Sequence, residues 1–218
     1  MNRPLWVAAL LTVSLSAQAP PASSTAQGEW PTYGGDLANT KYSPLDQVTA
    51  ANFSSLKIAW RAPSPDGFLS MTLPDGSEWA ADSKAIFAEL SRIDPKRWRD
   101  NQPPFVQNYK ATPLMVGGTL YVNTPSSVGA AYDARTGKKV YEHRLGTGGS
   151  FTSSPIAADG KVYVSNEEGQ TFVIKAGPQF EILGVSKLDG YTLASPIAVD
   201  DRLFIRTGEA LYCIGRKR

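Results

Sequence analysis

The sequence predicts an all-β protein, a partial β-propeller of about three four-stranded blades. Two observations predict it: a short proline motif recurs at intervals of 42 and 41 residues, and each copy is followed by the same series of apolar runs and turns. A period of this length is typical of propeller blades, each of which is a small antiparallel sheet. A meandering β-sandwich also has short strands and Gly/Pro turns, but it does not require a repeat.

The motif divides the second half of the chain into three repeats, which we place at residues 111–152, 153–193 and 194–218. It is Ala-Thr-Pro-Leu at 111–114, Ser-Ser-Pro-Ile at 153–156 and Ala-Ser-Pro-Ile at 194–197. A strand with an aromatic residue eight positions after the proline follows in each, and then a third apolar run. Only the first two repeats have a fourth run, at 140–141 and 180–183. Short runs separated by turns indicate antiparallel strands.

The last repeat therefore lacks an outer strand. Leu56–Trp60 has a strand-like pattern and precedes the first repeat. Propellers often close with a strand from the amino end, which hides a sheet edge that would otherwise pair with other chains. We expect Leu56–Trp60 to complete the last blade by pairing with Leu211–Ile214.

Residues 27–110 form an N-terminal segment with this closing strand and a short helical insertion. Between Trp60 and Ala111 the sequence predicts a hairpin turn at 73–76. A helix should follow, capped by Asp82 or Ser83 and ended by Asp94-Pro95. The insertion could cover a propeller face or contact a partner, but a plain packing role is the favoured interpretation.

Residues 1–26 have the pattern of a signal peptide and linker. Arg3 precedes a short apolar run at 5–15, and small residues follow. Such a pattern directs export, and the run is too short for a bilayer core of ~30 Å. We expect a periplasmic or secreted protein with no membrane span in the mature chain. The signal peptide could be cleaved after Ala19 or after Ala26.

The composition excludes several classes of function. The formal net charge is +2 and is spread along the chain, so we expect no nucleic-acid partner. Because the chain has one cysteine and one histidine, no intramolecular disulfide can form and a zinc site or a histidine-based triad is disfavoured. We expect His143 to be an ordinary strand residue rather than a catalytic base. Cys213 should be a small buried side chain rather than a nucleophile.

Several of these segments together resemble the PQQ-dependent (quinoprotein) dehydrogenases. They are Trp30–Asp36 (Trp-Pro-Thr-Tyr-Gly-Gly-Asp), Lys41–Leu45, Leu56–Trp60, Ala111–Val122 and the Tyr132–Gly137 turn. Residues 151–215 are similar to the final repeats of the wider PQQ-like propeller family. The resemblance implies part of an eight-bladed propeller, with PQQ near its axis, a calcium ion beside it and an aspartate that acts as general base in the oxidation of alcohols or sugars. It also implies that the middle blades are missing, between about His143 and Phe151.

The resemblance gives one candidate cofactor-binding residue, Lys110. It stands where many alcohol-oxidising members place a glutamate, two residues before the Thr-Pro pair. A lysine could pair with the acidic quinone, or it could be a solvated charge at the end of a strand. No catalytic aspartate and no metal ligand can be assigned, since Asp133 and Asp159 belong to turns. PQQ and calcium are thus implied by resemblance alone.

Three functions remain open at this stage. The chain could be a catalytically incomplete relative of quinoprotein alcohol and sugar dehydrogenases, a noncatalytic periplasmic scaffold that binds envelope proteins, or the remnant of an internal deletion. We also expect a homodimer that closes a propeller ring, because known propellers close with four to eight blades.

Overall fold

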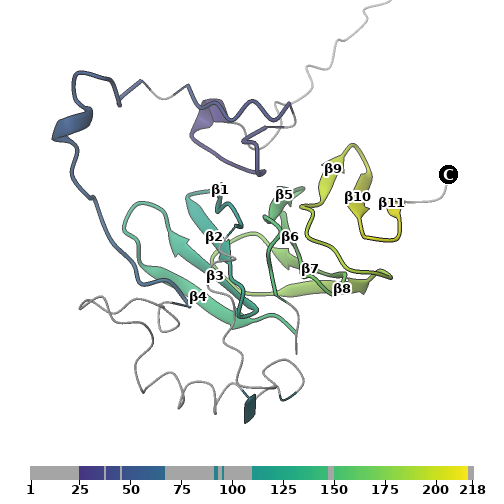
Figure 1. Cartoon of the computed structure of the whole chain (residues 1–218). Coiled ribbons are helices and arrows are strands. Elements are labelled where there is room, and N and C mark those ends of the chain that lie inside the picture. The colour runs from purple at the N-terminus through teal and green to yellow at the C-terminus, as the bar shows by residue number, and fades with distance from the viewer. Residues whose placement is uncertain are drawn as a thin grey trace, which may run out of the picture.

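The computed structural model describes residues 25–36, 38–44, 46–66, 91–92, 95, 110–146 and 150–215. Three antiparallel sheets, β1–β4, β5–β8 and β9–β11, are arranged as a fan (Figure 1). We call these sheets blade 1, blade 2 and blade 3. In the described part, helical structure other than Ser91 and Arg92 is limited to the short 3-10 turns Thr25–Gln27 and Phe53–Ser55. The prediction of an all-β partial propeller is confirmed.

Each blade has its strands in chain order. Blade 1 consists of β1 (Leu114–Val116), β2 (Thr119–Asn123), β3 (Val128–Asp133) and β4 (Lys139–Arg144). Blade 2 consists of β5 (Ile156–Ala158), β6 (Lys161–Ser165), β7 (Gln170–Lys175) and β8 (Ile182–Lys187). Blade 3 consists of β9 (Ile197–Val199), β10 (Arg202–Arg206) and β11 (Leu211–Ile214).

Tight turns join the first two strands of every blade. Gly117 and Gly118 have positive φ between β1 and β2, and Asp159 and Gly160 do so between β5 and β6. Two-residue hairpins favour residues that tolerate positive φ, because this backbone twist matches the twist of the flanking strands. The turns thus fix the same register in each blade.

The main core lies between blades 1 and 2. The apolar side chains of this buried cluster come from facing sides of the two sheets and from the connection between them: Leu114, Tyr121, Ala131, Leu145, Phe151, Val162, Val164, Phe172 and Ile174. Alternation along each strand directs these side chains inward. The interface between blades 1 and 2 is therefore a packed layer of two sheets.

The inner strands of the three blades are linked by a repeated hydrogen bond. The Thr112 N–H donates to Ser154 Oγ at 2.8 Å, and the Ser154 N–H donates to Ser195 Oγ at 2.9 Å. All three residues directly precede the proline of the repeat motif. The motif therefore sets the spacing between blades, and we call this series the hydroxyl ladder.

The segment around Trp30 crosses blades 1 and 2. Trp30 and Met115 exchange two backbone hydrogen bonds, and the Ala157 N–H donates to Pro31 O at 2.8 Å. Figure 1 shows the N-terminal residues over the ends of β1 and β5. This segment ties together the inner strands of two blades.

The expectation that an N-terminal strand closes the last blade was wrong. Leu56–Trp60 forms no strand in the structure, and Ile58 is 83% exposed. Trp60 lies instead against the β3–β4 turn, where its indole Nε1–H donates to Ala134 O at 3.0 Å. Among the described residues β11 pairs only with β10. The pairing with Leu211–Ile214 does not form within this chain, because blades 1 and 2 separate the two segments.

Other expectations lie outside the described residues. These are the signal peptide up to residue 24, the hairpin turn at 73–76, and the helix from Asp82 to Pro95 apart from residues 91, 92 and 95. In the part of the chain that the structure describes, no helix is long and apolar enough to cross a membrane.

Candidate functional site

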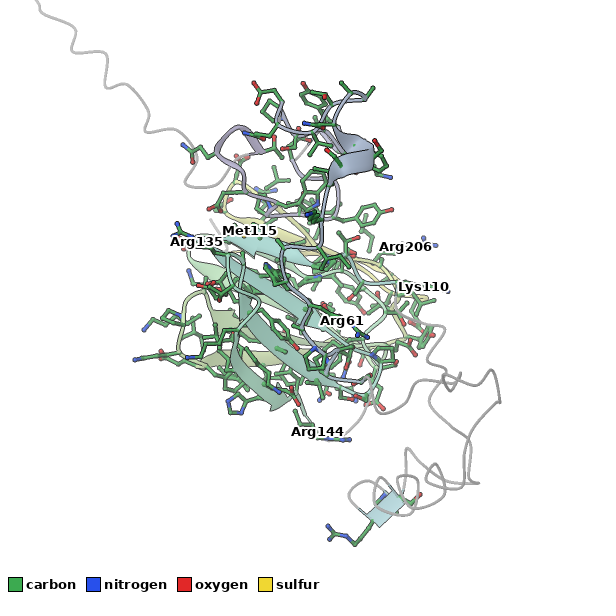
Figure 2. The ribbon with its side chains drawn as sticks, turned by 90° about the vertical axis from the view of Figure 1, so that its left-hand side faces the viewer. Arg61, Lys110, Met115, Arg135, Arg144 and Arg206 are labelled. Atoms are coloured by element: carbon green, nitrogen blue, oxygen red, sulfur yellow. The ribbon has the colours of Figure 1, made fainter. Side chains whose placement is uncertain are left out.

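Lys110 lies where the chain enters blade 1, at the end of the sheets where the inner strands begin. The residue is exposed, and the next residue, Ala111, lines a cavity of about 250 Å³. Figure 2 looks towards this side of blade 1, with Arg61 and Lys110 labelled. We call the hollow the Trp60 cavity; its walls are Trp60, Ala62, Pro63, Ser64, Pro65, Ala111, Pro113, Leu120, Val122, Asn123, Thr124 and Tyr132.

The walls of the Trp60 cavity are held by two long-range hydrogen bonds. Trp60 is fixed by its bond to Ala134 O, and the Tyr132 hydroxyl donates to Pro63 O at 3.2 Å. Burial raises the pKa of Tyr132 above its usual value. The cavity is thus a largely apolar, aromatic slot, a surface suited to a planar or aliphatic group rather than to an ion.

Asp66 forms the polar end of this region. Its side chain is 1% exposed and accepts hydrogen bonds from the Thr124 hydroxyl at 2.8 Å, the Ser126 N–H at 3.1 Å and the Ser126 hydroxyl. Sequence reasoning missed this residue, because its partners are about 60 positions away along the chain. Its bonds join the segment after Trp60 to the β2–β3 turn.

Glu167 occupies a similar place between blades 2 and 3. It accepts hydrogen bonds from the Thr152 hydroxyl and from the Tyr191 hydroxyl, the latter at 3.3 Å. The pKa of Tyr191 is raised, first by burial and then by the charge of Glu167. Asp66 and Glu167 are therefore both bonded to neighbouring loops.

The turn aspartates were predicted correctly. Asp133 accepts bonds from the Thr136 N–H at 2.8 Å and the Thr136 hydroxyl at 2.7 Å, which lower its pKa. Asp159 is paired with Lys161 at 2.5 Å, and this contact lowers its pKa as well. His143 is an exposed residue of β4, and its ring stacks on Phe180 at 4.0 Å. It is a strand residue, as expected.

The expectation that Cys213 is buried was wrong. Cys213 is exposed, whereas Ala131, which holds the same register position in blade 1, is fully buried. Blade 2 covers Ala131, and no described blade covers that face of blade 3. Burial at this position depends on the next blade and not on the local sequence.

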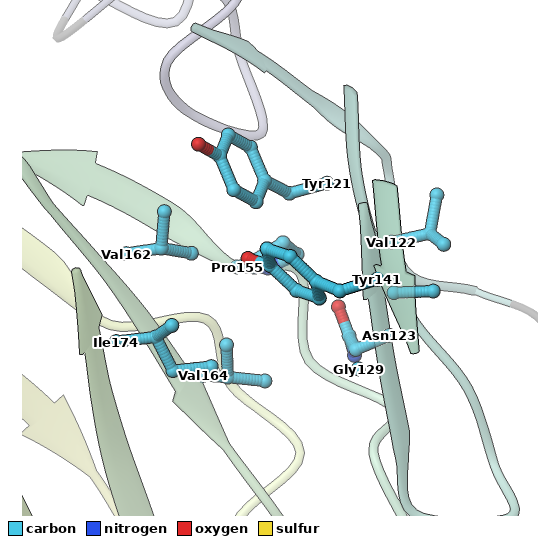
Figure 3. A pocket seen from close by; sticks show the side chains of 10 residues that line it. Tyr121, Val122, Asn123, Gly129, Tyr141, Pro155, Val162, Val164 and Ile174 are labelled. Carbon is cyan, nitrogen blue, oxygen red and sulfur yellow. The ribbon is translucent and has the colours of Figure 1, made fainter. Parts of the chain in front are cut away.

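A small gap lies between blades 1 and 2 (Figure 3). Its volume is about 10 Å³, roughly the room that one water molecule needs. Asn123 Oδ1 is buried there without a hydrogen-bond partner, and Tyr141, whose pKa is raised by burial, lines the same gap. The gap suits a structural water rather than a substrate.

A second large cavity, of about 360 Å³, lies between the N-terminal segment and the inner strands of blades 2 and 3. Tyr33, Asp36 and Asn39 form one wall, and Ile156 and Ile197 belong to the other. Asp36 is bound by the Thr40 N–H and hydroxyl, which lower its pKa. Its charge therefore stabilises its own loop.

Comparison with known families shows where this fold belongs. A sequence model of the PQQ family, described as the glucose/ethanol/alcohol dehydrogenase β-propeller domain, matches residues 30–183. The chain belongs to this family. The match begins at Trp30 and includes blade 1 and most of blade 2.

Individual relatives agree with the family assignment. Quinohemoprotein alcohol dehydrogenase of Comamonas testosteroni is 26% identical over 192 residues, or 84% of this chain and 22% of that protein. Quinoprotein glucose dehydrogenase of Escherichia coli K12 is 32% identical over 143 residues, or 63% of this chain and 14% of that protein. This PQQ-family chain thus spans about a fifth or less of the length of these relatives.

Solved structures show the same fold. Quinohemoprotein alcohol dehydrogenase ADHIIG of Pseudomonas putida HK5 superposes with a TM-score of 0.54 at 21% identity, covering 83% of this chain and 23% of that one. The Comamonas testosteroni enzyme gives a TM-score of 0.51 at 23% identity, covering 84% and 23%. These likenesses support the partial propeller.

The described residues do not fit the cofactors that the family implies. Ca²⁺ takes six to eight oxygen ligands, yet in the described part of the chain no three His, Cys, Asp or Glu residues cluster. PQQ is a planar tricarboxylate, whereas the Trp60 cavity is mainly apolar and Lys110 is exposed beside it.

Proposed function

We propose that this PQQ-family chain is catalytically incomplete and acts as a noncatalytic binding propeller. One observation carries the proposal: Asp66 and Glu167, two carboxylates at the end of the blades where the inner strands begin, accept hydrogen bonds from hydroxyl groups of neighbouring loops. A general base needs a lone pair directed at the proton that it removes. Here the lone pairs hold the loops together.

A dye-reduction assay tests the loss of catalysis. The purified protein would be supplied with PQQ, Ca²⁺ and a panel of alcohols and sugars, with the Escherichia coli quinoprotein glucose dehydrogenase as a positive control. We expect the control to reduce the dye with glucose and this chain to give the rate of a protein-free blank. Sustained turnover by this chain would refute the proposal.

Quinone binding through the exposed Lys110 is a second candidate, which follows from the family to which the chain belongs. Equilibrium dialysis with PQQ would test it with K110A and with K110R, which keeps the positive charge. If Lys110 pairs with a quinone carboxylate, K110A should weaken binding and K110R should retain it. Equal affinity of all three proteins would exclude this role of Lys110.

The binding function we favour is a scaffold for extended protein segments in the cell envelope. Its support is β8, the outer strand of blade 2, on which Ile182, Leu183 and Val185 are exposed. An exposed strand can add an extended peptide through its backbone groups. A partner purified from envelope extract should be retained by the wild type and lost with the double variant L183D/V185D. A partner retained equally by both would place the surface elsewhere.

The envelope location is part of this proposal and rests on the signal-like pattern of residues 1–26. Cell fractionation with amino-terminal sequencing would test it. We expect the mature protein outside the cytoplasm, beginning shortly after Ala19 or Ala26. An intact residue 1 in a cytoplasmic fraction would contradict it.

A further inference from the structure

Blade 3 exposes the side chains that blades 1 and 2 bury. Leu114, Ile156 and Ile197 follow the proline in the three repeats, and their exposed fractions are 0%, 3% and 54%. Blade 2 covers Leu114, and blade 3 covers Ile156. No described blade covers Ile197, which lines the cavity beneath the N-terminal segment. The face that contains Ile197 and Cys213 is thus a blade interface without its second half.

Blade 1 has the opposite half of such an interface. Its Leu120 and Val122 correspond to Val162 and Val164 of blade 2, which are buried against blade 1. In blade 1 the two residues instead line the Trp60 cavity of about 250 Å³. The cavity therefore lies on the face of blade 1 where side chains of a preceding blade would pack.

The hydroxyl ladder is open at the same two ends. Ser154 accepts from blade 1 and donates to blade 3, so the ladder runs in one direction. Within the described part of the chain, the Ser195 N–H has no acceptor and the Thr112 hydroxyl has no donor. A donor on blade 3 and an acceptor on blade 1 are the groups that one more step of the ladder would join.

The strand edges at the two ends of the fan are also complementary. Leu56–Trp60 is anchored beside blade 1 by Trp60, with Leu56 and Ile58 exposed. At the far end of the fan, β11 lacks an outer neighbour among the described residues, and its Leu211 is 73% exposed. The blade that docks on blade 1 would bring its last strand next to Leu56–Trp60.

We propose that the occupant of these faces is a second copy of this chain, joined head to tail. Blade 3 of each copy packs on blade 1 of the other about a two-fold axis, which closes a six-bladed ring with two identical interfaces. Ile197 enters the partner's Trp60 cavity, and the Ser195 N–H donates to the hydroxyl of the partner's Thr112. Each β11 then pairs with residues 56–60 of the partner copy.

Light scattering tests the interface with two matched variants. I197D places a charge on the proposed interface, and V185D places one on the outer strand of blade 2, where the native residue is 53% exposed, compared with 54% for Ile197. We expect the wild type and V185D to have twice the mass of one chain, and I197D to have the mass of one chain with an unchanged far-ultraviolet spectrum. A monomeric wild type, a dimeric I197D or assemblies larger than two copies would overturn the proposal.

A cysteine pair tests the direction of the contact. In a C213S background, T112C/S154C places two cysteines at a step of the ladder within one chain. It shows whether cysteines at this spacing can form a disulfide. T112C/S195C probes the step between copies, because blade 2 separates these residues within one chain. When isotope-labelled and unlabelled protein are mixed before oxidation, T112C/S195C should give a disulfide-linked peptide pair with one labelled member. A disulfide in T112C/S154C but none in T112C/S195C would exclude the head-to-tail contact.

Discussion

Gly137 is one of the points at which the N-terminal segment contacts blade 1. Its φ is +71°, and an added Cβ would lie 2.6 Å from Cδ2 of the Trp60 indole. Gly160 has a similar φ of +66° in the β5–β6 turn, with open space around the Cβ position. Comparing substitutions at these two positions separates the cost of backbone strain from the cost of displacing Trp60.

We expect G137A to destabilise the protein more than G160A. The left-handed conformation costs a non-glycine residue about 1–2 kcal/mol at either site, and only G137A must also displace Trp60. Urea unfolding followed by tryptophan fluorescence would measure the difference. Equal losses would show that Trp60 does not pack on this turn.

Asp66 offers a second test at the scale of single residues. D66A removes the acceptor of two hydroxyl groups and one backbone N–H in a buried site. An unsatisfied buried donor costs about 1–3 kcal/mol, so the loss should be of about that size or larger. D46A, at an exposed aspartate, is the control and should change the unfolding midpoint little.

Some single residues could be predicted from sequence and others could not. The roles of Asp133 and Asp159 follow from neighbours within three positions, so the turn residues were identified correctly. Cys213 and Asp66 depend on partners in distant parts of the chain, so local sequence gave the wrong environment for one and no signal for the other.

At the scale of elements, the Asp133–Gly137 turn should make stability depend on pH. The pKa of Asp133 is lowered by its bonds to Thr136, so folding favours the ionised carboxylate. This stabilisation is complete above the unfolded pKa of ~3.9 and is lost as the pH falls through the lower folded value. Urea midpoints between about pH 5 and pH 2 should fall less steeply in T136V than in the wild type. Parallel curves would contradict the assignment.

The hydroxyl ladder gives a further prediction for the elements. S154A leaves the Thr112 N–H without its acceptor, and S195A does the same to the Ser154 N–H. Each change should cost about 1–3 kcal/mol of unfolding free energy, because a partly buried donor is left unpaired. Chemical denaturation would measure both, with S55A, whose hydroxyl is exposed, as the control. A negligible loss in both variants would mean that the ladder contributes little to blade packing.

The strands themselves were the most predictable part of the fold. Three copies of one motif determine three similar sheets, because pairs such as Leu114–Tyr121 and Ile156–Tyr163 lie within one repeat. Pairing of Leu56–Trp60 with β11 involves about 150 intervening residues. No local pattern specifies such a contact, and this expectation failed within the chain.

For the whole molecule, the N-terminal segment stabilises the fan by joining blades that are otherwise held by their packed faces. Trp30, Pro31 and Trp60 contact β1, β5 and the β3–β4 turn through backbone and indole hydrogen bonds. The cavity between this segment and blades 2 and 3 shows that it also covers the inner strands. Its removal should therefore affect the entire arrangement rather than one blade.

A chain that begins at Ala62 tests this role. It loses the bonds of Trp30 to Met115 and of Pro31 to Ala157, and it uncovers the side of blade 1 on which Trp60 lies. The exposed inner strands and apolar faces should then pair with other copies, because unprotected sheet edges are templates for aggregation. Compared with a chain that begins at Thr25, we expect lower solubility and a lower thermal midpoint, measured by sedimentation and by circular dichroism. If both proteins stay equally soluble and heat-resistant, the blades hold together without the segment.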